Sequence, residues 1–148
     1  MAETILETER LVLRPVQPDD LAVWLDQLNS PEVMARIGGV RSPEKVAENF
    51  ARLLADQNED EFPFLAVTLK SDSTVIGKCG LARIRESGAP EALTGEVQVG
   101  WTLRADYWGR GFAREAAEAI LALGFGRFGQ ATVYGQTSES NAPSWRLM

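Results

Sequence analysis

The sequence predicts one α/β domain whose sheet is mostly antiparallel and contains a single parallel pair of strands. The chain has 148 residues and 45% of them are hydrophobic, which suffices for one core and indicates no second domain over residues 1–148. Along the chain, apolar residues switch between the alternation of a strand and the spacing of a helix. Near the C-terminal end, one helical segment separates two strand-like segments, and such a crossover joins parallel neighbours.

The N-terminal part of the chain predicts one strand followed by two helices. Residues 10–16 alternate leucine with arginine, as a half-buried strand does. Residues 18–28 begin with Pro18 and two aspartates and then place large apolar side chains on one face. Residues 42–57 begin with Ser42 as the expected N-cap, and their apolar side chains form one stripe. We expect both helices to pack on the core.

The middle of the chain predicts an antiparallel hairpin. Residues 62–70 and 74–85 have the composition of strands, and a Ser-Asp-Ser turn at 71–73 separates them. Gly77 and Gly80 interrupt the second strand. Glycine inside a strand indicates a bulge or the close approach of another backbone.

The last third of the chain predicts the parallel pair. After a polar loop at 86–95, residues 96–103 and 131–137 have strand patterns, and an amphipathic helix lies between them. Residues 141–148 begin a further helix. The turn after strand 96–103 lies at its carboxyl end, where open α/β sheets bind ligands.

Composition excludes several functions. The formal net charge of −6 argues against nucleic acid and anionic membranes as partners. The chain has no histidine and Cys79 is its one cysteine, so we expect no disulfide, no metal site and no His-based triad. Cys79 is expected to be a small buried apolar residue. The acidic N-terminus lacks a signal-peptide pattern and no apolar run reaches about 18 residues, so we expect a cytoplasmic protein.

The stretch DYWGRGFAREA, residues 106–116, predicts an anion site. Gly109 and Gly111 let a ligand approach the backbone, and the helix that follows offers unpaired N–H groups and a positive dipole end. Arg110 and Arg114 add charge. Alternatively, the glycines only permit a tight turn. A P-loop is excluded because no Lys-Ser or Lys-Thr follows, and a dinucleotide fingerprint would need glycine at position 114.

Three segments, one of which contains the glycine turn, resemble the GNAT superfamily of acyl-CoA-dependent N-acyltransferases. The family's pyrophosphate loop is Gln/Arg-x-x-Gly-x-Gly/Ala, and Gly111 and Ala113 match its last two key positions, whereas Trp108 replaces the Gln or Arg. YWGRGFAREA is similar to the loop of the branch that acetylates the N-termini of ribosomal proteins, the Rim-type enzymes. The segments TERLVLRPVQPDD, VGWTLRADYWGRGFAREA and NAPSWRLM also resemble this branch, in order along the chain.

The resemblance implies acetyl-CoA as acyl donor and a primary amine as acceptor. Backbone N–H groups of residues 109–114 would bind the pyrophosphate, and the pantetheine arm would lie where strands 96–103 and 131–137 splay apart. Trp101 and Trp108 fit either a cleft wall or a pantetheine contact. The implied cofactor-binding residues are Trp101, Thr102, Leu103, Trp108, Gly109, Arg110, Gly111, Phe112, Ala113, Arg114 and Asn141, the last at the pantetheine amide.

The implied chemistry is direct attack of an amine on a thioester. It needs a base, an oxyanion donor and a proton for the thiolate. An N–H group near Val99 to Trp101 would bind the oxyanion, and Ser144 would supply the proton. Gln98 stands where relatives carry a glutamate base, so Glu96, on the same strand face, is the alternative base or a solvated carboxylate.

A second hypothesis is a module that binds acyl-CoA without catalysis, which Gln98 favours. The family's final antiparallel strands are absent from these 148 residues. We therefore expect either a homodimer through the exposed edge of strand 131–137 or a truncated chain with an open acceptor pocket. Protein N-termini, amino-sugar antibiotics and polyamines all remain open as acceptors.

Overall fold

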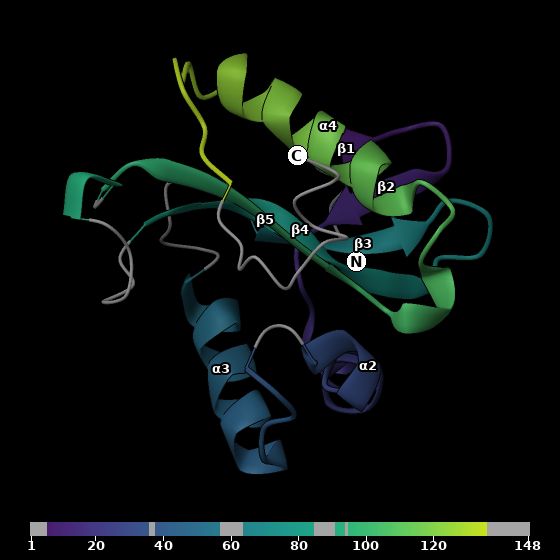
Figure 1. Cartoon of the computed structure of the whole chain (residues 1–148). Helices are drawn as coiled ribbons and strands as arrows, with labels where there is room; N and C mark the ends of the chain where they lie inside the picture. The colour runs from purple at the N-terminus through teal and green to yellow at the C-terminus, as the bar shows by residue number, and fades with distance from the viewer. Residues whose placement is uncertain (1–5, 36–37, 57–63, 85–90, 94, 136–148) are drawn as a thin grey trace.

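The computed structural model describes residues 6–35, 38–56, 64–84, 91–93 and 95–135. One antiparallel sheet contains five strands in chain order: β1 (Leu6–Glu7), β2 (Leu11–Arg14), β3 (Phe64–Leu69), β4 (Val75–Arg83) and β5 (Val97–Leu103). The labelled helices in Figure 1 are α2 (Pro31–Met34), α3 (Pro43–Asp56) and α4 (Phe112–Phe125). Helix α4 covers one face of the sheet, and α2 and α3 lie on the other (Figure 1). The α/β fold class with a mostly antiparallel sheet is confirmed.

The strands agree with the sequence except at the N-terminus. The expected strand over 10–16 is β2, and it pairs with β1, which the sequence did not predict. With two residues, β1 is too short to show a strand period. The expected hairpin is β3 and β4, paired antiparallel. The loop at 86–95 contains the short 3-10 turn η3 (Glu91–Leu93).

Two helical segments differ from expectation. The helix expected over 18–28 is a run of three turns: η1 (Pro18–Asp20), α1 (Leu21–Val23) and the π-helical η2 (Trp24–Leu28). Helix α2 follows it and was not predicted; its N-cap Ser30 accepts a hydrogen bond from the Val33 N–H. Helix α3 begins as expected, because the Ser42 hydroxyl accepts a hydrogen bond from the Lys45 N–H.

The sheet separates two apolar cores. On the α4 face, side chains of β2 to β5 pack with the buried Phe112, Ala116 and Ile120 of α4, and the partly buried Leu6 of β1 packs against the same core. On the opposite face, Trp24 and Phe50 pack edge to face with their ring centroids 5.3 Å apart. The expectation that both early helices pack on the core is therefore confirmed.

Alternate backbone groups of β5 point to its two edges. The Ile84 N–H donates to the Glu96 carbonyl, so the even-numbered residues of β5 form the hydrogen-bonded pairs with β4. The odd-numbered residues point to the other edge, where the Tyr134 N–H donates to the Val97 carbonyl and the Val99 N–H donates to the Tyr134 carbonyl. This bridge is parallel. One parallel bridge, at Tyr134, therefore represents the predicted parallel pair in the described residues.

The structure describes residues 131–135 of the strand predicted over 131–137 and assigns no strand there. Within its described part, 131–135, Tyr134 alone pairs with β5. Residues 136 and 137 lie outside the described residues.

Gly77 marks the bulge expected in β4. The pairing shifts between Val67 and Thr68 of β3, so that β4 has one residue more than its partner at this point. A Cβ built on Gly77 would lie 2.2 Å from the Thr102 carbonyl oxygen. Glycine is thus required because the backbone of β5 approaches closely.

The substitution Gly77→Ala should lower the free energy of unfolding by about 1–3 kcal/mol, because β5 must move to admit the methyl group. Gly100→Ala is the matched control in β5, since its Cβ would lie 3.4 Å from the Phe64 ring. Urea unfolding of both variants measures the difference. Equal stability of the two variants would contradict the close approach.

Candidate functional site

The glycine turn adopts backbone conformations that only glycine takes readily. After the 3-10 turn η4 (Ala105–Tyr107), Gly109 and Gly111 have φ angles of +76° and +81°. A Cβ on Gly109 would have no neighbour within 4 Å. The turn therefore requires glycine for its backbone, and it leaves open space beside that backbone. The interpretation as a tight turn and the interpretation as a ligand loop are both compatible with this geometry.

The turn leads into the N-terminus of α4, where backbone N–H groups lack acceptors. Gly111 is the N-cap of α4 and has no side chain to cap it. The N–H groups of the first turn, Phe112 to Arg114, have no acceptor within the helix, and the Glu115 N–H is the first to bond, to the Gly111 carbonyl. Because the helix dipole adds positive potential here, an anion is the expected ligand.

Trp108 closes the turn onto β5. Its indole N–H donates a 3.0 Å hydrogen bond to the Leu103 carbonyl, while the ring is 46% exposed. The tryptophan that departs from the family pattern therefore has a structural role, and its exposed ring borders the loop.

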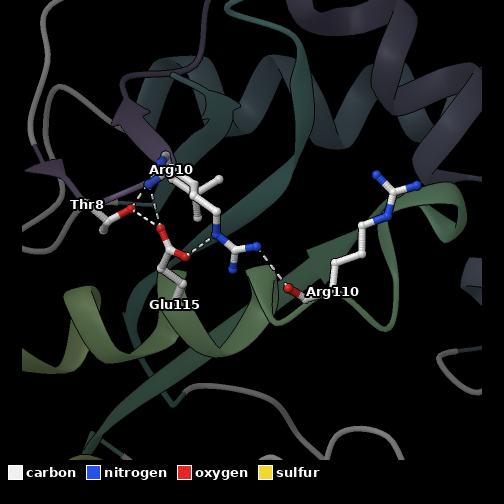
Figure 2. A network of polar contacts seen from close by, with 5 residues as sticks. Thr8, Arg10, Arg110 and Glu115 are labelled. Carbon is white, nitrogen blue, oxygen red and sulfur yellow. Dashed lines mark hydrogen bonds and ion pairs between the residues drawn. The ribbon is translucent and has the colours of Figure 1, made fainter. Parts of the chain in front are cut away.

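A network between β1, β2 and α4 fixes the loop from behind (Figure 2). The Arg10 guanidinium donates to Glu115 Oε1 at 2.8 Å and to the Arg110 carbonyl at 3.0 Å. The Thr8 hydroxyl and the Arg10 N–H both donate to Glu115 Oε2. The guanidinium also lies 4.2 Å from the centroid of the Phe112 ring. We call Thr8, Arg10 and Glu115 the loop clamp.

The clamp keeps Glu115 ionised. Partial burial alone would raise the pKa of Glu115, but hydrogen bonds from Thr8 and Arg10 outweigh it and hold the pKa below its ordinary value. The sequence analysis missed this role, although TER and REA both lie in the quoted motifs. An acidic residue in the first turn of an anion-binding helix was the available signal, since it requires a compensating cation.

The two arginines of the loop differ in their partners. Arg110 is exposed, and in Figure 2 its side chain points away from the clamp, with the guanidinium 5.3 Å from the Tyr107 ring centroid. Arg114 is exposed and pairs with Glu118, with Nε 3.0 Å from Oε1. Arg110 is therefore the less compensated cation of the loop.

Strand β5 presents an open backbone edge beside this loop. On this edge, the Tyr134 backbone forms hydrogen bonds with Val97 and Val99, and the Trp108 indole N–H donates to the Leu103 carbonyl. Among the described residues no element pairs with Trp101 on this edge. Trp101 and Leu103 thus lie where the resemblance requires a pantetheine edge. The Thr102 backbone faces β4 instead.

A cavity of about 290 Å³ lies on the face of the sheet that α3 covers, opposite α4, and Thr102 of β5 is one of its lining residues. Its wall is mostly apolar, with Trp24, Leu28 and Phe50 from the helical side and Phe64 from β3. The remaining lining residues are Asn29, Met34, Arg41, Val46, Asn49, Leu53 and Lys78. Strand β5 therefore has the loop at its end, an open edge and a cavity on one face.

Two lining residues of the cavity, Lys78 and Arg41, carry positive charge, and the sequence analysis did not single them out. Lys78 lies in the wall with its Nζ 5.9 Å from the Phe64 ring centroid, and burial, followed by the nearby Arg41 charge, lowers the pKa of Lys78. Arg41 is held at the rim by two backbone hydrogen bonds with the side chain of Asn29, of 2.8 and 2.9 Å. Only tertiary packing brings these residues together.

Of the expected catalytic residues, the structure describes Glu96 and Gln98. Glu96 is exposed and directly precedes β5, and the parity of the strand puts it on the same face as Gln98 and Thr102. Neither Glu96 nor Gln98 lines the cavity. Asn141 and Ser144 lie outside the described residues.

Cys79 is fully buried in the core on the α4 face, and burial raises the pKa of its thiol to about 12. The prediction that it packs as an apolar residue is confirmed. Within the described residues no cluster of His, Cys, Asp and Glu could hold a metal ion. No described helix has the length and apolar character needed to cross a bilayer.

Fold and geometry together define an α/β domain with a glycine turn between β5 and the N-terminus of α4 and a cavity on one face of the sheet. A family model described as acetyltransferase (GNAT) domain matches residues 10–148. The chain belongs to this family of acetyltransferases, as its motifs indicated.

Individual relatives agree with the family. An uncharacterized N-acetyltransferase, p20, of Bacillus licheniformis is 26% identical over 145 residues, which cover 97% of this chain and 78% of that protein. The crystal structure of an acetyltransferase from Agrobacterium tumefaciens matches with a TM-score of 0.80 and 29% identity, over 96% of this chain and 78% of that chain.

More distant structures share the fold. RimL, a ribosomal alpha-N-protein acetyltransferase, has a TM-score of 0.74 at 14% identity, over 99% of this chain and 78% of that chain. An aminoglycoside acetyltransferase in complex with coenzyme A has a TM-score of 0.75 at 20% identity, over 93% and 80%. Rim-type enzymes are thus among the structural neighbours, as the loop motif suggested.

The loop clamp should stabilise the protein through its ionised carboxylate. Glu115→Gln should lower the free energy of unfolding by about 1–2 kcal/mol at pH 7, because it removes a charge-assisted acceptor. Because folding lowers the pKa of Glu115, its carboxylate stabilises the folded protein fully above pH 4.5, the ordinary pKa value. The difference in the free energy of unfolding between the two proteins should therefore shrink as the pH falls below 4.5. Urea unfolding from pH 7 to pH 3 measures it.

Glu118→Gln is the control, since it removes an exposed carboxylate from the same helix. Its effect should stay below about 0.5 kcal/mol. A Glu115→Gln protein as stable as this control at pH 7 would show that the clamp contributes nothing.

Proposed function

We propose that this acetyltransferase moves an acetyl group from acetyl-CoA to a primary amine by direct attack. The observation that carries the proposal is the convergence on β5 of three features: the glycine loop at its end, the open backbone edge at Trp101, and the cavity bordered by Thr102. A donor held on the edge and an acceptor held in the cavity would meet at one strand.

The loop is suited to the pyrophosphate of the donor. The N–H groups of residues 109–114 would donate to its oxygens, and Arg110 would add charge. The pantetheine arm would then follow the open edge, with hydrogen bonds to the backbone of Trp101 and Leu103. Membership of the GNAT family supports acetyl-CoA, and so does the relative whose structure contains coenzyme A.

The reaction needs few groups from the protein. The amine nitrogen forms a bond to the acetyl carbonyl carbon, the carbon–sulfur bond breaks, the amine proton goes to a base, and the thiolate takes a proton. Because the Val99 N–H is already bonded to Tyr134, the Trp101 N–H is the better donor for the oxyanion. Glu96 is the proposed base; because it lies five residues before Trp101, roughly 16 Å along the strand, it would act through a chain of waters. Ser144 is the proposed acid.

Binding without catalysis is the second candidate, because Gln98 occupies the position of the family's usual base and cannot accept a proton at neutral pH. The dimer through the edge of 131–137 stays a prediction, since Tyr134 alone represents that edge in the described pairing. Release of free thiol from acetyl-CoA in the presence of amines separates an enzyme from a binding module.

The site of donor binding can be tested at Gly109. Gly109→Leu should weaken coenzyme A binding at least about tenfold, because its side chain would enter the open space beside the loop. Gly129→Leu is the matched control: its φ is +63° and its Cβ would also have no neighbour within 4 Å, but it lies after α4 and not in the loop.

Titration calorimetry compares the two variants, with circular dichroism as a check on folding. The control carries a similar backbone strain, so its affinity should match the unsubstituted protein. Equal affinities for both variants would contradict the loop as the donor site.

The proposed acid and base predict distinct kinetic changes. Glu96→Gln should lower kcat by about 10- to 100-fold and remove the rising limb of its pH profile, because the amine loses its proton acceptor. Ser144→Ala should slow thiol release while leaving coenzyme A affinity unchanged. Glu118→Gln controls for loss of a surface carboxylate. Full turnover of the Glu96→Gln protein across the pH range would assign the base elsewhere.

A further inference from the structure

The acceptor cavity carries charge of one sign. Lys78 and Arg41 are its two charged lining residues, and no aspartate or glutamate lines it within the described part of the chain. Neither cation forms an ion pair with another described residue. In a protein of formal net charge −6, with 21 acidic residues, the described lining of this cavity is therefore of the opposite sign to the chain as a whole.

The surroundings make these charges costly without a partner. Lys78 is half-buried beside the Phe64 ring, and Trp24, Leu28 and Phe50 form the apolar wall of the same cavity. The Lys78 ammonium loses hydration there, and the exposed Arg41 adds repulsion by a like charge. A bound anion would relieve both effects, whereas a polyamine or other polycation would increase them.

We infer that the acceptor is a primary amine that also bears a carboxylate or phosphate group, and that Lys78 and Arg41 bind this anionic group. The inference rests on the proposed function, since it assigns the substrate class of the same site. Asn29 bonds to both backbone groups of Arg41, so the chain segment that carries this cation is anchored beside the cavity.

The position of Lys78 fits such an acceptor. Lys78 pairs with Thr102 across β4 and β5, and Thr102 adjoins Trp101, whose backbone faces the donor edge. An anionic group on Lys78 would therefore lie within about two strand spacings, or roughly 10 Å, of the transferred acetyl group. A small amino acid or the N-terminal residues of an acidic peptide span this distance.

Matched amines test the inference by thiol release from acetyl-CoA. The pairs are β-alanine with β-alaninamide, phosphoethanolamine with ethanolamine, and the peptide amides Ala-Glu with Ala-Gln; spermidine represents the polycations. The first two pairs test small molecules, and the third tests peptides. For at least one pair, kcat/KM should be about tenfold or more higher for the anionic member, as expected for one charge-assisted hydrogen bond.

Variants assign that preference to the two cations. Lys78→Gln and Arg41→Gln should each reduce the anionic-to-neutral ratio by several-fold to tenfold, while Lys78→Arg and Arg41→Lys should retain most of it. Arg52→Gln, on α3 and outside the cavity lining, should leave the ratio unchanged. Ratios compared between variants cancel the intrinsic basicity of each amine.

Each outcome decides the matter. A ratio near one in the unsubstituted protein, with turnover of neutral amines or spermidine, overturns the inference and leaves the proposed function intact. A preference for anions that survives Lys78→Gln and Arg41→Gln also overturns it. Coenzyme A binding without thiol release from any amine contradicts the proposed function itself, and the inference with it.

Discussion

Strand β5 has two faces and two edges with different environments, and every feature of the site depends on how they are divided. Its odd-numbered side chains pack with α4, and Thr102 borders the cavity on the other face. Its even-numbered backbone groups pair with β4, and its odd-numbered ones point to the edge that Tyr134 occupies at Val97 and Val99. A slip of one residue would exchange both assignments at once. The close approach of β5 to Gly77 opposes such a slip, since no side chain fits there.

The loop clamp resolves a conflict at the end of β5. The helix dipole favours an acidic residue in the first turn of α4, but a carboxylate beside the loop would repel an anionic donor. Arg10 pairs with Glu115 and also binds the Arg110 carbonyl, so the carboxylate is neutralised while the loop backbone is held. The amides and the Arg110 guanidinium then set the local potential. A chain of net negative charge can therefore present a positive loop.

The sequence predicts what is local and periodic. Strands β3 to β5 and helices α3 and α4 are long enough to show their period, and the glycine turn is contiguous along the chain. The two-residue β1 and the four-residue α2 are too short to show one. The π-helical form of 24–28 was not predicted either, because the helical spacing of its apolar residues does not specify which backbone carbonyl each N–H chooses.

Among the site residues, too, those close together in sequence were predicted, and those that meet only after folding were not. The loop was predicted because two glycines and a helix start are adjacent in sequence, whereas Arg10 and Glu115 are 105 positions apart and meet only after folding. Thr102 was assigned to the cofactor edge together with its neighbours. Its backbone instead faces β4, which depends on which residues of an antiparallel pair share hydrogen bonds. Lys78 gave no signal, because a lysine in a strand is usually solvated.

The sheet and the helices set different properties of the cavity that we propose to bind the acceptor. Lys78, Thr102 and the Trp101 edge belong to paired strands, so the separation between the cation and the donor edge is fixed by the backbone. The far wall comes from η2 and α3, and Arg41 comes from the segment between α2 and α3, held by Asn29. Changes in those helical segments would alter the size of the acceptor without moving the charge at the sheet. The distance from amine to anion is therefore the strictest requirement that this arrangement places on an acceptor, and the bulk of the acceptor is the most variable one.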